Sequence, residues 1–304
     1  MQIRRLTRED GRSAVELWKA TFYEDSAAFV DWFFQNRYPS DNTWGAFEGD
    51  ELVSVSHGTV MNIRLRQREV EALMISGVAT KESFKGQGLM KAVLQSQMSA
   101  AKKSGIPIAF NRPVNPDIYA SLGFVHCTDT LFINQASFGS EGAEVLPWSE
   151  EAAFRLYQSI SKRYCGMVAR SRSDFKLKLM DYRSDNAKTL LISNGYCVYY
   201  ETDEQVYIEE ALSQGSFVPL LAALHKVCKK PLSGKLPPDA DVAGEVKPMN
   251  VYALISRDKL LSLFDCPQKL ARTMDDGQLL RFIFGYEGSG QAFTKQICFC
   301  IDEY

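Results

Sequence analysis

Two glycines separated by one residue stand where the sequence changes from a strand pattern to a helix pattern. The segment Lys85–Met90, K-G-Q-G-L-M, follows the apolar run ALMISGVAT and precedes a helical pattern that begins near Gly88. The first N–H groups of a helix have no partner within it and lie at the positive end of its dipole, and glycines let a diphosphate approach the backbone closely. The segment therefore indicates an anion-binding loop, although a tight turn with a helix cap explains the glycines equally well when they are taken alone.

The spacing does not match the two common nucleotide-binding loops. A dinucleotide-binding Rossmann loop has a third glycine and belongs to a β-α-β unit, whereas here no third glycine follows and antiparallel strands are expected before the loop. The Lys-Ser/Thr pair of a P-loop is also lacking. Nucleotide hydrolysis is therefore disfavoured.

The thiol and imidazole groups do not suggest metal or redox chemistry. The seven cysteines form no C-x-x-C pair, and there are only three histidines. Cys298 and Cys300 are two residues apart in an apolar run, which puts both on one face of a strand and favours buried packing. We expect reduced thiols and no metal.

The glycine loop lies inside a segment with the pattern of one α/β unit. A strand over 2–6 is followed by helical patterns over 8–22 and 26–38, with Ser26 placed as a cap. From Thr43 to Thr80 the period indicates three antiparallel strands. After the loop, a long helix closes at Gly105, and a β run, a short helical turn and a strand from Val125 to Ile133 complete the unit near residue 138.

A second unit repeats this order without the glycine loop. Helices, three short strands, a helix and a late strand are expected between residues 139 and 257, and the stretch 231–248 has the composition of a loop or short edge strand. The fold class is therefore mixed α/β, mainly antiparallel sheets with helices. The predicted domains are 1–138, 139–257 and a C-terminal tail, 258–304.

Two motifs together resemble the GCN5-related N-acetyltransferases (GNAT). One is K-G-Q-G-L-M, in which Lys85 stands for the family's Arg or Gln and Met90 for a small residue, and the other is Y-A-S-L-G-F, from Tyr119 to Phe124. The G-x-G-L-M variant, the I-Y-x-x-x-G-F box and the second, degenerate unit are similar to the Eis (enhanced intracellular survival) family. That resemblance implies an acetyltransferase with a shortened C-terminal region, since some 45 residues cannot form the sterol-carrier-like third domain of that family.

The resemblance also implies where acetyl-CoA, the expected co-substrate, binds. The strand before the loop would splay from its neighbour and bind the pantetheine arm, and the loop amides would bind the pyrophosphate, with a lysine adding a charged contact. The residues that match these roles are Val78, Ala79 and Thr80 for the arm, Gly86, Gln87, Gly88, Leu89 and Met90 for the pyrophosphate, Lys85 or Lys91 for the charged contact, and Val114 and Asn115 beside the thiol. Thr80 and Asn115 would also suit a strand end and a pre-proline turn.

The chemistry implied is attack of a neutral primary amine on a thioester, which needs a proton donor for the sulfur and a base. Tyr119 matches the family's donor, with core packing as the alternative reading. By resemblance the base is the terminal carboxylate, here that of Tyr304. An internal base is left open among four residues, His57, Asp25, Glu24 and Glu71, and four aromatic residues, Trp32, Phe33, Phe34 and Trp44, are candidates for the acceptor pocket or for the core.

Composition narrows the partners. The net charge of −2 and the lack of a basic stripe disfavour nucleic acid, and no signal peptide or membrane-spanning run is seen, so a cytoplasmic location is expected. The acceptor is a small-molecule or protein amine, and a homo-oligomer is left open. The rival reading is a non-catalytic acyl-CoA-binding or sensor protein, because Lys85 and Met90 depart from the family motif.

Overall fold

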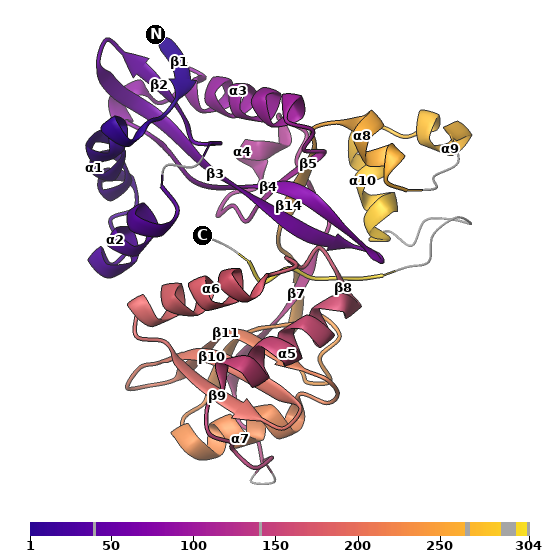
Figure 1. The fold of residues 1–304 in the computed structure, drawn as a ribbon. Coiled ribbons are helices and arrows are strands. Elements are labelled where there is room, and N and C mark those ends of the chain that lie inside the picture. Colours follow the sequence, from indigo (N-terminus) through magenta and orange to yellow (C-terminus); the bar gives the residue numbers. More distant parts are fainter. Residues whose placement is uncertain (39–40, 140–141, 265–267, 287–295, 303–304) are drawn as a thin grey trace.

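The computed structural model describes residues 1–38, 41–139, 142–264, 268–286 and 296–302. They form a mixed α/β fold with two large mixed sheets, one above the other in Figure 1, and a small two-stranded sheet, and each large sheet has helices on its faces. The mixed α/β prediction is therefore confirmed. Within the described residues, no helix has both the length and the apolar character needed to cross a membrane.

The first unit is built largely as the sequence predicts. Ser26 caps the second helix by accepting a hydrogen bond from the Phe29 amide at 3.0 Å, and Gly105 ends the third with φ 84°. Three antiparallel strands precede the glycine loop. The elements are β1 (Gln2–Arg5), η1 (Arg8–Asp10), α1 (Gly11–Thr21), α2 (Ala27–Asn36), β2 (Trp44–Glu48), β3 (Glu51–Leu65), β4 (Arg68–Thr80), η2 (Glu82–Phe84), α3 (Leu89–Lys103), β5 (Ile108–Asn111), α4 (Asp117–Ala120), β6 (Val125–His126) and β7 (Asp129–Ala136).

The second unit has the same order of elements after its first helices. It comprises α5 (Glu150–Ile160), η3 (Ser161–Arg163), β8 (Tyr164–Cys165), α6 (Arg172–Ser184), β9 (Lys188–Ile192), β10 (Gly195–Glu201), β11 (Val206–Ser213), α7 (Val218–Cys228), β12 (Leu232–Leu236), β13 (Glu245–Pro248) and β14 (Val251–Leu254). The C-terminal region adds α8 (Arg257–Ser262), α9 (Gln268–Thr273), α10 (Asp276–Phe284) and β15 (Ile297–Cys298).

The two sheets exchange their last strands. The strand order is β1-β2-β3-β4-β5-β14-β6 in the first sheet and β13-β7-β12-β11-β10-β9 in the second, so β14 enters the first sheet and β7 the second. The single strand predicted from Val125 to Ile133 is therefore wrong, because it breaks after His126 into β6 and β7, which lie in different sheets. The division at 138 and 257 stays a prediction for domains, and the sheets do not divide at those positions.

The stretch 231–248 contains an interior strand that its composition concealed. β12 lies between β11 and β7 and all five of its residues are buried, so the predicted loop or edge strand is wrong there, whereas β13 does lie at the sheet edge. Gly234 allows the close packing, since a Cβ there would lie 2.3 Å from the carbonyl oxygen of Ile208.

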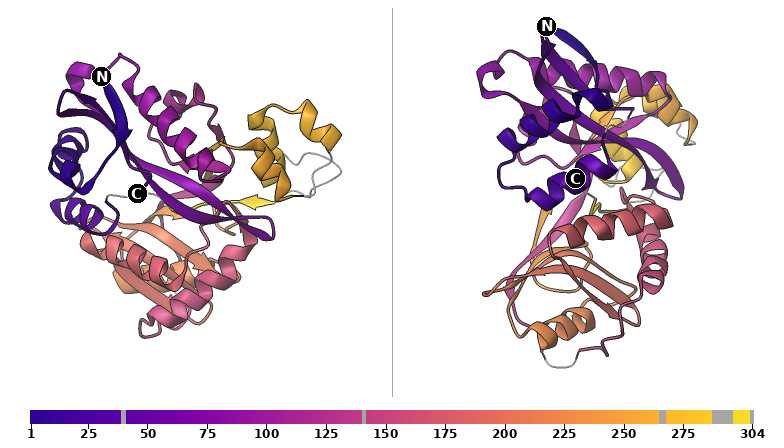
Figure 2. Two further views of the ribbon diagram at one scale, coloured as in Figure 1. Left: turned by 45° about the horizontal axis from the view of Figure 1, so that its top comes forward. Right: turned by 60° about the vertical axis from the view of Figure 1, so that its left-hand side comes forward.

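The C-terminal strand lies between the two units (Figures 1 and 2). Cys298 and Cys300 pack into the core that contains Tyr252 and Phe284, while Phe299 and Ile301 pack into the core formed by α5, α6 and the second sheet. Because successive side chains of an extended chain point to opposite sides, this one segment contributes to both cores. The prediction that the two cysteines share one buried face is confirmed.

Candidate active site

The glycine loop leaves the positive end of α3 open. Gly86 and Gly88 have φ values of 77° and 75°, which favour glycine, and a Cβ at either position would have no atom within 4 Å. No side chain caps α3, and its first turn holds no acidic residue. The first amides of this 15-residue helix are therefore accessible to an anion.

A cavity of about 530 Å³ runs beside this loop. We call it the loop cavity. Its wall is mostly apolar and includes the two loop glycines and two lysines. It is lined by Thr21, Val78, Thr80, Phe84, Lys85, Gly86, Gly88, Leu89, Met90, Lys91, Ile118 and Leu122. The donors of the helix start and an apolar channel thus lie together, as a diphosphate joined to a less polar arm requires.

β4 has a free edge next to this cavity. Its parallel pairing with β5 covers only Ala72 to Met74, and beyond that point the two strands separate. Gly77 has φ 50°, and a Cβ there would lie 2.1 Å from the Trp18 ring, so no other residue fits at this irregularity. Among the described residues, the backbone groups of β4 after Met74 that point to the β5 side therefore have no strand partner, while those on the other side pair with β3.

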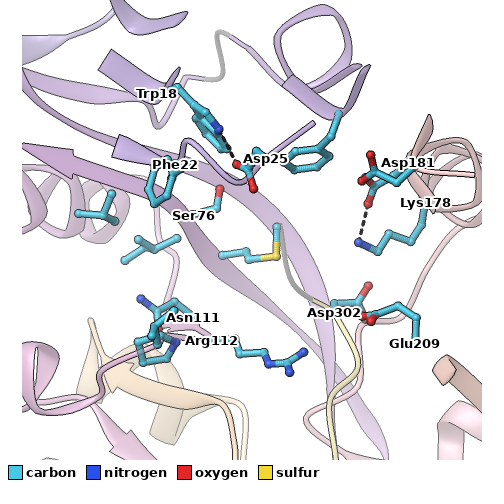
Figure 3. Close-up of a pocket in the computed structure, with 18 of the residues that line it drawn as sticks. Trp18, Phe22, Asp25, Ser76, Asn111, Arg112, Lys178, Asp181, Glu209 and Asp302 are labelled. Atoms are coloured by element: carbon cyan, nitrogen blue, oxygen red, sulfur yellow. Dashed lines mark hydrogen bonds and ion pairs between the residues drawn. The ribbon is translucent and has the colours of Figure 1, made fainter. Parts of the chain in front are cut away.

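A larger cavity of about 760 Å³ opens between the two units (Figure 3). We call it the inter-unit cavity. Trp18, Phe22, Asp25, Phe29, Met74, Ile75, Ser76, Gly77, Val78, Asn111, Arg112, Pro113, Val114, Asn115, Ile118 and Tyr119 line it from the first unit, and Lys178, Asp181, Tyr182, Asp185, Tyr200, Glu209 and Asp302 complete it. Val78 and Ile118 belong to both cavities, so the two adjoin at these residues.

Tyr119 lies in the wall of the inter-unit cavity with 8% of its surface exposed. Its ring packs against Phe124 with the centroids 5.5 Å apart, so the packing reading is confirmed, and the role of proton donor stays a prediction. Burial raises the pKa of the Tyr119 hydroxyl, while a hydrogen-bonding interaction with Asn111 acts in the opposite direction. The buried Oδ1 of Asn111 has no hydrogen-bond partner. Sequence reasoning missed Asn111. The only signal for it in the sequence is its position at the end of the β run that forms β5.

The candidates for an internal base separate clearly. Asp25 lines the inter-unit cavity, accepts a hydrogen bond from Trp18 Nε1 at 2.8 Å, and has a pKa raised above its ordinary value by burial. Glu24 and Glu71 are exposed and line neither cavity. The terminal carboxylate of Tyr304 lies outside the described residues.

His57 is a buried core residue. It is 2% exposed, neither ring nitrogen has a hydrogen-bond partner, and rings of Trp18, Phe33, Phe34 and Tyr38 surround it at 5.2–5.9 Å. Burial lowers its pKa to about 3, which keeps the ring neutral. Because it does not line either cavity, it is in no position to act on an acceptor.

The remaining predicted residues differ in where the structure puts them. Thr80 lines the loop cavity and bonds Ser54, whereas the Ala79 side chain is buried in the core under α1 and the Gln87 side chain points back to the Ser83 carbonyl. Lys91 lines the loop cavity. So does Lys85, which also makes an exposed ion pair with Glu82 at 2.6 Å.

Val114 and Asn115 lie in the wall of the inter-unit cavity. Val114 is fully exposed, and Asn115 Oδ1 accepts from the Asp117 amide at 3.1 Å, so Asn115 also serves the turn.

The aromatic residues of the pocket are not those considered from sequence. Trp32 and Phe33 are buried in a cluster around Trp18, and none of Trp32, Phe33, Phe34 and Trp44 lines either cavity. The pocket reading of those four is wrong. Trp18, Phe22 and Phe29 line the inter-unit cavity instead, from the last turn of α1, the residue after it and the first turn of α2.

The wall from the second unit is rich in ion pairs. Lys178 pairs with Asp181 at 2.6 Å, and Lys235 pairs with Glu209, whose side chain reaches the inter-unit cavity. Figure 3 shows Lys178, Asp181, Glu209 and Asp302 on one side of this cavity and Asp25, Ser76 and Asn111 on the other. Sequence reasoning missed this wall, since its members come from separate elements. Among the described residues no cluster of histidine, cysteine or acidic side chains is arranged to hold a metal ion.

Comparison with known proteins finds one family model that matches the first unit. Residues 2–127 match the sequence model of a family described as "Acetyltransferase (GNAT) domain". No curated protein matches the chain.

Several solved structures share the fold at low identity. A probable N-acyltransferase from Enterococcus faecalis is 13% identical, with a TM-score of 0.70 over 86% of this chain and 74% of that chain. A GCN5-related N-acetyltransferase from Anabaena variabilis is 14% identical, with a TM-score of 0.71 over the same shares of the two chains. Eis1 from Mycobacterium abscessus is 14% identical, with a TM-score of 0.63 over 84% and 74%. The likeness covers both units.

Proposed function

Since residues 2–127 match the sequence model of a GNAT acetyltransferase domain, we propose that the protein transfers an acetyl group from acetyl-CoA to a primary amine. The observation that carries this proposal is the junction of the two cavities at Val78 and Ile118, with Tyr119 in the wall of the inter-unit cavity. CoA bound in the loop cavity would place its thioester at this junction, and an acceptor in the inter-unit cavity would reach the thioester from the other side.

The loop cavity suits CoA in its chemistry. The uncapped start of α3 offers N–H donors to the pyrophosphate, with Lys91 beside it, and the free edge of β4 offers backbone groups to the amides of the pantetheine arm. Lys85 would exchange its exposed ion pair with Glu82 for a phosphate contact. Little stabilisation would be lost, because exposed ion pairs contribute little to the free energy of folding.

We assign the proton donor to Tyr119. The acceptor nitrogen attacks the carbonyl carbon, the carbon–sulfur bond breaks, and the Tyr119 hydroxyl protonates the departing sulfur. The raised pKa of this tyrosine keeps it protonated at neutral pH. Asp25 is the proposed acceptor of the proton that the amine loses, because it lines the inter-unit cavity and its raised pKa makes it a better base than an ordinary aspartate.

The rival is a protein that binds acyl-CoA without turnover. A thiol-release assay with acetyl-CoA and a panel of primary amines separates the two, and mass spectrometry of the amine confirms the acetylated product. Release of CoA that depends on the amine is expected. Binding of acetyl-CoA without release for every amine would support the sensor instead.

A further inference from the structure

One carboxylate oxygen in the wall of the inter-unit cavity lacks a hydrogen-bond partner. Asp302 lines this cavity with 1% of its side chain exposed, and its Oδ1 accepts a hydrogen bond from Arg170 Nε at 2.9 Å. Its Oδ2 is buried and accepts nothing. A buried carboxylate oxygen without a donor costs free energy, so this atom marks a place where a donor would bind well.

The other members of the network are fully engaged. Arg170 donates two hydrogen bonds to Glu210, at 3.1 and 2.9 Å, and the hydroxyls of Tyr182 and Tyr196 also donate to Glu210. Burial opposes the charge on Glu210, but these contacts outweigh it and hold the pKa of its carboxyl below the ordinary value. Glu210 therefore has no need of a further donor.

The charges of this network do not balance. One guanidinium, that of Arg170, stands between two carboxylates, those of Glu210 and Asp302, and all three side chains are at most 2% exposed. One negative charge is left over in a place shielded from water, and Asp302 is the member of this network that lines the inter-unit cavity. A cation in the inter-unit cavity would neutralise it.

We propose that Asp302 Oδ2 binds a cationic group of the acceptor, and that Arg170 and Glu210 position Asp302 for this purpose. The inference rests on the proposed function. The reacting amine must be neutral to attack, so the cation held by Asp302 is a second group of the same molecule. The second unit would thus contribute to acceptor recognition through Arg170, which precedes α6, and Glu210 on β11.

The test variant is Asp302→Asn. An asparagine keeps an oxygen for Arg170 Nε, removes the negative charge and replaces the second oxygen by an uncharged NH2 group, which cannot accept from a cation. KM is measured for a diamine such as 1,4-diaminobutane and for pentylamine, a monoamine of similar length. The expected result is a rise of about tenfold or more in KM for the diamine, the size of a lost hydrogen bond between charged groups, with KM for pentylamine and the Kd of acetyl-CoA unchanged.

The matched control is Asp276→Asn, which removes a carboxylate from an exposed ion pair with Arg257, outside both cavities. It should change neither KM. Equal effects of Asp302→Asn on the two amines, or a fall in kcat at constant KM, would overturn the assignment. A wild-type protein with the same KM for both amines would also overturn it, and this result does not depend on how the variant folds.

Failure of the proposed function is recognised separately. If no amine releases CoA, diamine binding is measured by calorimetry on the wild-type protein and on Asp302→Asn. Binding that is lost in the variant supports the subsite without turnover, whereas equal binding, or none to the wild-type protein, rejects it.

Discussion

The two units begin the same helix in opposite ways. In the first, the glycine loop leads into α3 with no side chain at the helix start. In the second, the loop before α7 is closed by its own residues. Asp241 accepts the Phe217 amide at 2.8 Å, and the hydroxyl of Ser216 accepts the Val218 amide at 3.2 Å. Pro219, in the first turn of α7, has no N–H to offer.

The strands beside these helices also leave an open gap in the first unit and a filled gap in the second. β4 and β5 separate after Met74 and border a cavity, whereas β11 and β12, which also pair in parallel, are joined by the buried ion pair of Glu209 and Lys235 just past their last paired residues. With the same order of elements, the first unit thus leaves backbone donors free beside a cavity, whereas in the second unit side chains bond the donors and fill the gap between the strands. A carboxylate of the chain itself stands in the second unit where an external anion would bind in the first.

The largest expected effect comes from adding a carboxylate to each loop. Gly88→Glu should abolish acetyl-CoA binding in calorimetry, because a side chain at φ 75° is strained and its charge would stand at the helix start in place of the pyrophosphate. Gly215→Glu is the matched control in the second unit, where a Cβ also meets no atom within 4 Å, and it should leave the affinity intact. Unchanged affinity in Gly88→Glu would remove the loop from the binding site.

The second effect tests the buried ionic network of the second unit. Arg170→Met should destabilise the protein by about 3–5 kcal/mol in urea unfolding, because Glu210 and Asp302 would both remain buried without a counter-charge. Arg12→Met removes an arginine from an exposed pair with Glu16 and should have no measurable effect. Equal stability of Arg170→Met and the wild-type protein would mean that the network carries no unbalanced charge.

The third effect concerns catalysis in the first unit alone. Tyr119→Phe should lower kcat on the order of a hundredfold and leave the Kd of acetyl-CoA unchanged, since it removes a proton donor and little surface. Tyr286→Phe, which removes a hydroxyl bonded to Asp129 outside both cavities, should keep the full kcat. Wild-type turnover in Tyr119→Phe would mean that Tyr119 packs in the core and is not the proton donor.

The pH profile sharpens this assignment. The pKa of Tyr119 is raised, so the proton is retained as pH increases, and the rate should fall only above pH 10, the ordinary value for tyrosine. A fall that begins below pH 10 in the wild-type protein and is absent in Tyr119→Phe would contradict the direction of this shift.

The smallest effect is expected at Asp241. Asp241→Ala removes the acceptor of the Phe217 amide and should reduce the free energy of unfolding by about 1 kcal/mol. It should not create a second CoA site, because Pro219 and the Glu209–Lys235 pair remain. Calorimetry that finds two molecules of CoA bound to Asp241→Ala would show that this one carboxylate keeps the second unit closed.

The parts of the site that sequence predicts are those made by neighbouring residues. Gly86 and Gly88, the start of α3 and the box that contains Tyr119 lie within short segments whose backbone preferences act locally. The base candidates show the limit of such reasoning. His57 and Asp25 were equivalent in the sequence, and burial in the aromatic cluster or exposure to the inter-unit cavity separated them.

The sequence alone therefore determined the mixed α/β class, the repeated order of elements and the open loop before α3, because period, capping and glycine conformation depend on residues a few positions apart. Only the tertiary structure decided the exchange of β7 and β14, the closing of the second loop by Asp241, and the contact between Arg170 and Asp302. The last two side chains are 132 positions apart, and what brings them together is the packing of residues 298–301 between two cores. No short segment of the chain contains both partners of such a contact, so no local pattern predicts it.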